Sequence, residues 1–360
     1  MQSSPYQFGF KARHGTDSCI FALKEVIGYY LKSGSPVLVS FLDVKSAFDR
    51  VRYTKLFIKL IERGAPVYLV ALLYQWYKSQ FLVARWGSSV SEPFKMANGI
   101  RQGSVLSPYL FSVYVDGLNA ELSRAKVGCH VAGVPMNNFS YADDIAIVGP
   151  SAKAVNKLLE VCDSFANRHD IMFSTTKSVC MLVQSRGVNR VRSPPEIILS
   201  GEVLEYVHNF KYLGHIITDN LSDNDDIMRE VKSLYCRGNL LIRKFKHVGM
   251  DIKCALFKAY CFSMYTAALW CNFTQGILYR LKVCYNSIMR RLAGVPRWES
   301  ARNMFVQLRV RSFEETMRCV CYSLMSRVDV DFNPILWTLH HCDAFLTSDV
   351  QHHWRRVLFR

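Results

Sequence analysis

The pattern of apolar and polar residues is most distinct in residues 139–149, FSYADDIAIVG. Bulky apolar residues alternate with small ones, stop at Asp143 and Asp144, and resume at Ile145. Alternation with a period of two on both sides of a polar pair predicts two short strands joined by a tight turn. This turn would carry two adjacent carboxylates on a rigid hairpin.

Helical and extended patterns alternate through the first 220 residues. Apolar residues at helical spacing follow the candidate cap Thr16-Asp17, and Gly34-Ser35-Pro36 ends that helix. Residues 37–43, VLVSFLD, are an almost unbroken apolar run, which predicts a strand covered on both faces. We also expect helices within 53–77, from about 109 to 122 and after the cap Ser151, a hairpin at 80–95 turning near Gly87, and strands at 178–183 and 210–217.

The pattern changes near residues 218–225. From Asp223 onward it is helical, with candidate caps at Asp223 and Asp251, and basic residues become frequent. We therefore predict a mixed α+β region over 1–220 and an all-helical region over 221–360.

Composition indicates a large folded core. Half of the 360 residues are hydrophobic and the mean hydropathy is +0.05, so two or three packed subdomains are expected. No run of eighteen uncharged apolar residues occurs, which predicts no membrane-spanning helix, and the first fifteen residues lack the apolar centre of a signal peptide.

The charge is strongly positive, with 45 basic and 29 acidic residues and a formal net charge of +16. Nucleic acid is the commonest partner of such a protein, and a generally basic surface without a ligand is the alternative. The twelve cysteines show no repeated CxxC pair, which favours buried free thiols in an intracellular protein. A zinc site from Cys319, Cys321, His340, His341 and Cys342 is the alternative, although that spacing fits no common finger. No compact basic run distinguishes nucleus from cytoplasm.

A third carboxylate completes the candidate chemistry. Asp43 ends the apolar strand 37–43, so its side chain would lie at a strand tip. If it meets Asp143 and Asp144, the three form an oxygen-rich site suited to Mg²⁺. Two such ions activate an attacking hydroxyl and stabilise a leaving pyrophosphate.

Five motifs follow one another along the chain, and two of them contain these aspartates. They are FLDVKSAFDRV (41–51), GIRQGSVLSPYLF (99–111), YADD (141–144), TTKS (175–178) and KYLGHII (211–217). In them the chain resembles the reverse transcriptases of non-LTR (LINE-type) retrotransposons and, more distantly, those of group II introns. The resemblance spans about residues 7–217 and continues more loosely to about 310.

The resemblance implies a right-hand polymerase fold, with fingers and palm in 1–220 and a helical thumb in 221–360. It implies RNA-directed DNA synthesis with an RNA template, a DNA primer and deoxynucleotides, and leaves open an assembly with the element RNA. Asp43, Asp143 and Asp144 match the metal-binding carboxylates, which would hold two Mg²⁺ ions, with Mn²⁺ as a substitute. Lys177 matches a lysine facing the active site that is a candidate proton donor to pyrophosphate.

Further matches concern the incoming nucleotide. Phe48 falls where the family places a bulky residue beneath the sugar, so it would exclude a 2′-hydroxyl, and core packing is the alternative. Gln102 and Gly103 match the loop near the incoming nucleotide and template base, and Arg101 is either a phosphate contact or a solvated arginine.

Two more segments match the family. Lys11 and Arg13 resemble the fingers loop that grips the triphosphate, with Arg13 favoured and a solvated basic loop as the alternative. Tyr212, Leu213 and Gly214 match the primer-grip hairpin, for which a plain strand is the alternative.

The resemblance begins late in the motif order. The earliest fingers segment should precede residue 7, where six residues are available, so we expect fingers truncated at the N-terminus. An active polymerase therefore competes with a catalytically silent, truncated or domesticated remnant that binds nucleic acid. An RNA-dependent RNA polymerase is disfavoured by Phe48 and by the YADD sequence.

Overall fold

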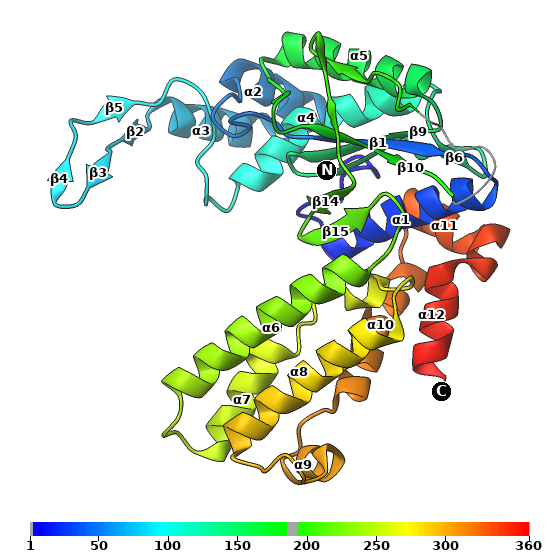
Figure 1. The fold of residues 1–360 in the computed structure, drawn as a ribbon. Coiled ribbons are helices and arrows are strands. Elements are labelled where there is room, and N and C mark those ends of the chain that lie inside the picture. Colours follow the sequence, from blue (N-terminus) through cyan, green and yellow to red (C-terminus); the bar gives the residue numbers. More distant parts are fainter. Residues whose placement is uncertain (1–2, 186–192, 360) are drawn as a thin grey trace. The chain divides into compact units, whose positions relative to one another are not determined.

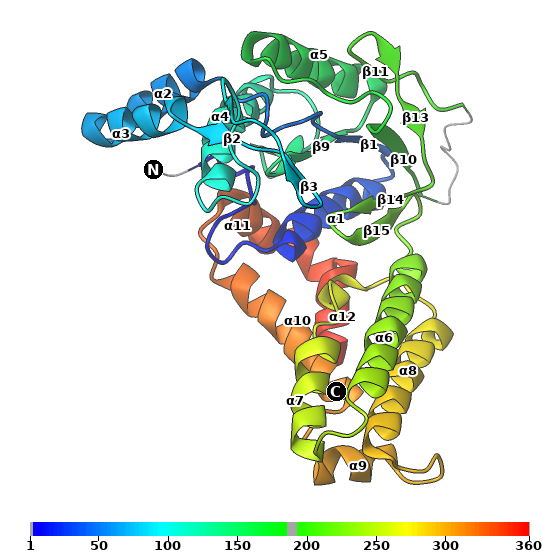
Figure 2. The ribbon, with the colours of Figure 1, turned by 90° about the vertical axis from the view of Figure 1, so that its left-hand side faces the viewer.

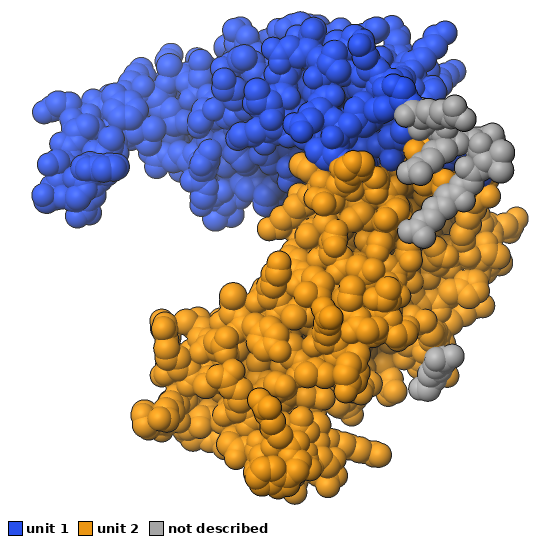
Figure 3. Space-filling model, in the orientation of Figure 1, with its two compact units in different colours: residues 1–19, 34–182, 186–207 blue, residues 20–33, 183–185, 208–360 orange. Residues whose placement is uncertain are grey.

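The structure is a computed structural model that describes residues 3–185 and 193–359. The chain folds into two compact units, which Figure 3 shows in different colours. Unit 1 comprises residues 1–19, 34–182 and 186–207, and unit 2 comprises residues 20–33, 183–185 and 208–360. Within the described ranges, no helix is long and apolar enough to cross a membrane.

Unit 1 is built on a five-stranded sheet with the order β13-β10-β1-β9-β8, and Figure 1 labels three of its strands, β10, β1 and β9. Its strands are β1 (Val37–Leu42), β8 (Asn138–Tyr141), β9 (Asp144–Gly149), β10 (Val179–Val183) and β13 (Glu205–Tyr206). Strand β9 pairs antiparallel with both β1 and β8, and Leu42 of β1 lies opposite Ile145 of β9. Strand β1 is buried along its whole length, which confirms the prediction from its apolar run.

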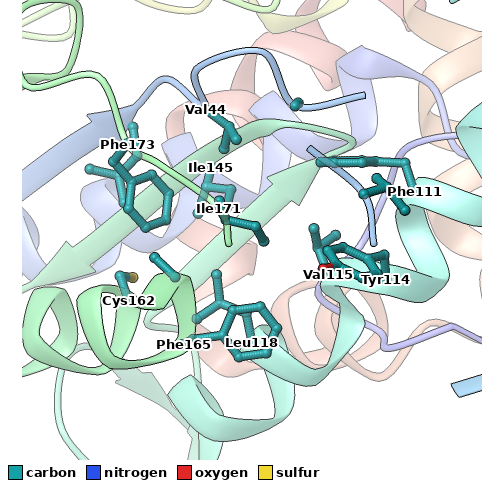
Figure 4. Close-up of a cluster of buried hydrophobic side chains, with 14 of the residues drawn as sticks. Val44, Phe111, Tyr114, Val115, Leu118, Ile145, Cys162, Phe165, Ile171 and Phe173 are labelled. Carbon is teal, nitrogen blue, oxygen red and sulfur yellow. The ribbon is translucent and has the colours of Figure 1, made fainter. Parts of the chain in front are cut away.

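Four helices pack in unit 1. They are α2 (Tyr53–Glu62), α3 (Val67–Lys78), α4 (Ser107–Arg124) and α5 (Ala152–His169). Helices α4 and α5 lie against this sheet, α2 packs on α4, and α3 packs on α2. Figure 4 shows Phe111 and Leu118 of α4 and Phe165 of α5 in one cluster with Ile145 of the sheet. Ser151 caps α5 by accepting a hydrogen bond from the N–H of Ala154, as predicted. This packing fixes the strand ends that carry the aspartates.

The expected helical stretch 53–77 is two helices. Gly64 has a φ of +74°, and Pro66 precedes α3 without a backbone N–H to continue a helix. The predicted hairpin at 80–95 is present, with Gly87 in its turn at a φ of +61°. The short strands of unit 1 are β2 (Phe81–Leu82), β3 (Arg85–Trp86), β4 (Ser89–Val90), β5 (Phe94–Lys95), β6 (His130–Val131), β7 (Val134–Pro135), β11 (Ile198–Leu199) and β12 (Glu202–Val203).

Unit 2 is mainly helical, as the ribbon in Figure 2 shows. Most of helix α1 belongs to this unit. Trp270 and Tyr285 are fully buried in its core. Its elements are α1 (Thr16–Lys32), the hairpin β14 (Asn209–Tyr212) and β15 (His215–Thr218), α6 (Asn224–Lys244), α7 (Met250–Cys261), η1 (Ala267–Leu269), α8 (Gln275–Ala293), α9 (Ala301–Gln307), α10 (Phe313–Asp329), α11 (Pro334–His341), η2 (Asp343–Thr347) and α12 (Asp349–Leu358).

Three expectations for this region need correction. The predicted strand 210–217 is a hairpin, because Leu213 and Gly214 both adopt positive φ and turn the chain. Asp223 occupies the N-cap position of α6, as predicted, but its side chain makes no capping hydrogen bond, since its carboxylate accepts from the N–H groups of Cys271 and Asn272 instead. Asp251 lies inside the first turn of α7, which follows Gly249.

The compact units differ from the expected division between 1–220 and 221–360 in three places, of which residues 183–185 are the shortest. The hairpin β14–β15 belongs to the same unit as α6, and the N–H of Ile216 in β15 donates to the buried Asp226 of that helix. Residues 20–33 also belong to unit 2, where Lys24 pairs with Asp223. The assignment of these regions to fingers, palm and thumb stays a prediction.

Candidate active site

The predicted acidic hairpin is present, and it lies beside the end of β1. Tyr141 pairs with Asp144, so Ala142 and Asp143 form a two-residue turn between β8 and β9. The β1–β9 register ends at Leu42 opposite Ile145, so Asp43 and Asp144 follow at adjoining ends of the paired strands. The structure thus brings the three aspartates to one end of the sheet.

The charges of these carboxylates interact. Desolvation by the surrounding protein raises the pKa of Asp144 to about 6, and the charges of Asp143 and Asp43 add to this rise. Desolvation also raises the pKa of Asp143, as does the charge of Asp43. Anions held near one another disfavour each other's ionised form, and a bound cation relieves that repulsion.

The three carboxylates are near one another but are not arranged as a ready-made metal site. In residues 3–185 and 193–359, no three His, Cys, Asp or Glu side chains are gathered closely enough to hold a metal ion as they stand. The donor chemistry nevertheless suits a hard divalent cation, because three neighbouring carboxylates offer oxygen ligands and repel one another.

The segment after α5 positions Asp43. The backbone N–H of Asp43 donates to Ser178 Oγ at 3.1 Å, and its carbonyl accepts from the N–H of Ser174 at 2.8 Å. This clamp places Lys177 at the site, with Nζ 3.9 Å from Asp43 Oδ2. Both side chains are exposed to solvent, so their ion pair contributes little to stability and leaves the ammonium available.

Two loops meet near the residues expected to contact the nucleotide. The N–H of Ile100 donates to the carbonyl of Phe48 at 2.8 Å, and a Cβ on Gly99 would lie 2.9 Å from the backbone of Asp49. The Phe48 ring is half-buried and packs against Phe111, with ring centroids 5.1 Å apart. Its ring therefore has a packing role in the core of unit 1.

The loop that follows carries Arg101, Gln102 and Gly103, and all three are exposed. The Arg101 guanidinium donates to the carbonyl of Phe81 at 3.4 Å. Gly103 has a φ of +81° with open space around its α-carbon, so backbone conformation explains glycine there.

The two basic residues of the N-terminal loop differ in their surroundings. The Lys11 ammonium donates to the carbonyl of Ser4 at 2.6 Å, so it supports the chain's own backbone. Arg13 is exposed and has a φ of +67°. Arg13 is thus better placed than Lys11 to reach a ligand.

The candidate primer grip belongs to unit 2. Tyr212 is buried at the end of β14 and pairs with His215, and Leu213 and Gly214 form the turn between the strands. The hydroxyl of Tyr265 donates to the carbonyl of Leu213 at 2.5 Å. The turn is consequently held from within its own unit.

The residues of the alternative zinc site have other contacts. Cys321 is buried with Sγ 3.8 Å from His353 Nε2, and Cys342 Sγ donates to the carbonyl of Leu339. Burial raises the pKa of the Cys321 thiol to about 12, which disfavours the thiolate that binds metals.

Sequence reasoning missed Gln7 and Asp226. Gln7 is fully buried, and its side chain contacts the turn between Tyr141 and Asp143. Asp226 is fully buried in unit 2, where its carboxylate accepts a hydrogen bond from the N–H of Ile216. A glutamine near the N-terminus and an acidic residue in the first turn of a helix are both common, so neither gave a signal.

Comparison with known proteins identifies the family. The profile described as "Reverse transcriptase (RNA-dependent DNA polymerase)" matches residues 1–217. The chain belongs to this reverse transcriptase family, which confirms the resemblance seen in the motifs. Enzymes of the family generally use divalent metal ions.

Curated relatives come from non-LTR retrotransposons. The chain is 24% identical over 337 residues to the RNA-directed DNA polymerase from mobile element jockey of Drosophila funebris, covering 90% of this chain and 36% of that protein. The Drosophila melanogaster jockey polymerase is 24% identical over 92% of this chain and 36% of its own length. The chain therefore spans about a third of the length of these relatives. Among solved structures, apo telomerase from Candida tropicalis matches with a TM-score of 0.46 and 10% identity, covering 95% of this chain and 54% of that one.

Proposed function

We propose that this chain is the polymerase region of a non-LTR retrotransposon protein and that it extends a DNA primer on an RNA template. The observation that carries the proposal is the gathering of Asp43, Asp143 and Asp144 at one sheet end, with the pKa of the latter two raised. A family match over residues 1–217 supports the reaction class.

In the proposed reaction, the 3′-hydroxyl of the primer releases its proton to water, and its oxygen attacks the α-phosphorus of a deoxynucleotide. A bond forms between that oxygen and the phosphorus, the bond between the α-phosphorus and the bridging oxygen breaks, and pyrophosphate leaves. Two Mg²⁺ ions held by Asp43, Asp143 and Asp144 would lower the pKa of the 3′-hydroxyl and stabilise charge on the pyrophosphate.

The chain's own side chains supply the remaining roles. Lys177 is exposed beside Asp43 and donates a proton to the departing pyrophosphate. Arg13 binds the triphosphate electrostatically, and Phe48 excludes a 2′-hydroxyl from the sugar position. Gln102 and Gly103 lie on an exposed loop that contacts the nucleotide and template base.

Primer extension tests the proposal. Purified protein is incubated with oligo(dT) annealed to poly(rA), Mg²⁺ and labelled dTTP, beside the double variant Asp143→Asn/Asp144→Asn. We expect extension by the parent only, with template binding by both proteins. Binding by both without extension by either would favour the silent remnant.

A matched control separates charge from fold. Asp163→Asn changes a carboxylate of unit 1 that accepts hydrogen bonds from Ser200, away from the acidic turn. Extension by this variant should equal that of the parent. Equal losses in this variant and the double variant would attribute the effect to instability.

A further inference from the structure

The segment before the family's fingers loop is part of the sheet. The N–H of Phe8 donates to the carbonyl of Ser140 at 2.8 Å, and the N–H of Ser140 donates to the carbonyl of Tyr6 at 2.9 Å. Gln7 therefore lies parallel to β8 as an isolated bridge at the edge of the sheet. Its side chain is fully buried.

The amide of Gln7 holds the residue that precedes Asp143. Its Oε1 accepts hydrogen bonds from the N–H of Ala142 and the N–H of Gly9, each at 2.9 Å. Its Nε2 donates to the carbonyl of Ala142 at 3.4 Å. The same amide group therefore contacts both the N–H and the carbonyl of Ala142.

Ala142 needs such support. Its φ of +58° is in the left-handed region, which is uncommon for a residue with a Cβ and persists where the surroundings hold it. A polar backbone group buried in this turn would be costly without a partner, and Gln7 supplies that partner.

Gly9 shows how closely the segment approaches the turn. A Cβ added there would lie 2.7 Å from the N of Ala142 and 3.2 Å from the carbonyl carbon of Tyr141. The next residue, Phe10, also contacts Tyr141, with ring centroids 6.3 Å apart. The segment thus leaves the turn no room to shift toward it.

We propose that Gln7 is a positioning residue for the Asp143–Asp144 turn and sets the affinity of the site for divalent cations. This inference rests on the proposed function, since it takes the turn to be where those cations bind. Residues that hold the ligands of a metal typically change its affinity by about 10-fold to 100-fold when they are lost.

Metal binding in the absence of substrate tests the proposal. Free Mn²⁺ is titrated into wild-type protein and the Gln7→Leu variant and followed by electron paramagnetic resonance, with thermal unfolding recorded in parallel. We expect the leucine variant to bind Mn²⁺ about tenfold more weakly or worse. The conservative variant Gln7→Glu keeps the acceptor oxygen, so it should bind more tightly than the leucine variant.

Asn137→Ala is the matched control. Asn137 is an equally buried amide in unit 1, but it donates to the carbonyls of Leu122 and Val127. This variant should lose stability and keep wild-type Mn²⁺ affinity. If Asn137→Ala weakens Mn²⁺ binding as much as Gln7→Leu, Gln7 acts only through general stability and the proposal is wrong.

The remaining outcomes are also decisive. Wild-type Mn²⁺ affinity in a folded Gln7→Leu variant overturns the proposal. If that variant does not fold, Gly9→Ala replaces it. The added Cβ would lie 2.7 Å from Ala142 N and 3.0 Å from Gln7 Oε1, so it displaces the contact between the glutamine amide and the turn. Unchanged affinity in this variant overturns the proposal too. If the Mn²⁺ affinity of the protein depends on Gln7 but the wild type does not extend a primer, the proposed function is rejected and this inference stands. Wild-type protein that binds no Mn²⁺ rejects both.

Discussion

Tyr265 fixes the turn at Gly214 from two directions. Its hydroxyl donates to the carbonyl of Leu213 at 2.5 Å, and its ring lies where a Cβ on Gly214 would be 2.9 Å away. Gly214 also has a φ of +85°, which disfavours any side chain. The turn of the candidate primer grip therefore has a single well-defined shape.

Gly214→Ala should destabilise unit 2 by about 1–3 kcal/mol, because it combines backbone strain with overpacking against Tyr265. If the turn grips the primer, the variant should also raise the KM for primer. Urea denaturation and primer titrations measure the two effects. Gly294→Ala is the control, since Gly294 has a φ of +70° with open space around it; an equal loss in both variants would remove the role of Tyr265.

Asp226 joins the hairpin to α6. Its carboxylate accepts hydrogen bonds from the N–H of Ile216 at 3.0 Å and from Trp270 Nε1 at 2.8 Å, and it pairs with Arg229 and His215. Asp226→Ala should lower the free energy of unfolding by about 3–5 kcal/mol, because it leaves the buried hydrogen-bond donors and the Arg229 charge without their acceptor. Asp225→Ala, in the same turn but exposed, should change it little. Similar losses from both changes would contradict this account.

The lowered pKa of the Asp226 carboxylate should make the fold less stable in acid. Burial alone would raise the pKa of Asp226, but hydrogen bonds from His215 and Arg229 outweigh it and hold the pKa below its usual value of 3.8. A lowered pKa stabilises the fold above about pH 4, and this contribution is lost as pH falls further. Unfolding measured from pH 7 to pH 2 should show a steeper loss in wild type than in Asp226→Ala.

Asp144 should change the stability of the fold with pH in the opposite direction to Asp226. Its pKa is raised to about 6, chiefly by desolvation, so the folded protein loses stability as pH rises from about 4 to 6. Without divalent metal at pH 8, Asp144→Asn should be more stable than wild type, because it removes a carboxylate charge that desolvation and its neighbours disfavour. Solvent screens part of this effect, so we expect a difference of about 1 kcal/mol. The difference should vanish near pH 3.5 and shrink when Mg²⁺ is added. Greater stability of wild type at pH 8 would contradict the repulsion.

If Phe48 lies beneath the sugar of the incoming nucleotide, it should select deoxynucleotides over ribonucleotides. Phe48→Val should increase incorporation of ribonucleotides relative to deoxynucleotides by about tenfold or more, since space opens beneath the sugar. Competition between dTTP and UTP on poly(rA) measures it. Phe57→Val removes a ring from the same core without touching the nucleotide loops and should leave the ratio unchanged. An unchanged ratio in Phe48→Val would leave the ring with its packing against Phe111 alone.

Local patterns predicted much of the site. The alternation around Asp143 and Asp144 gave the β8–β9 hairpin, the apolar run before Asp43 gave β1, and Ser151 gave the start of α5. Each signal lies within a few residues of the feature that it predicts, so a short stretch of sequence is sufficient.

Contacts between distant segments could not be predicted in this way. Gln7 holds Ala142 across 135 positions, and Lys24 pairs with Asp223 across 199. Asp223 resembles a helix cap in sequence, but its partners Cys271 and Asn272 become its neighbours only after folding. Such polar contacts depend on tertiary packing, which carries no local periodicity.

The central claim is that Asp43, Asp143 and Asp144 together hold divalent cations. Diffraction at the manganese absorption edge, from crystals soaked in Mn²⁺ and dTTP, tests it most directly. We predict an anomalous peak coordinated by Asp43 and the Asp143–Asp144 turn, and its loss in Asp43→Asn. A manganese ion bound elsewhere, or a peak at the turn that does not depend on Asp43, would contradict the account.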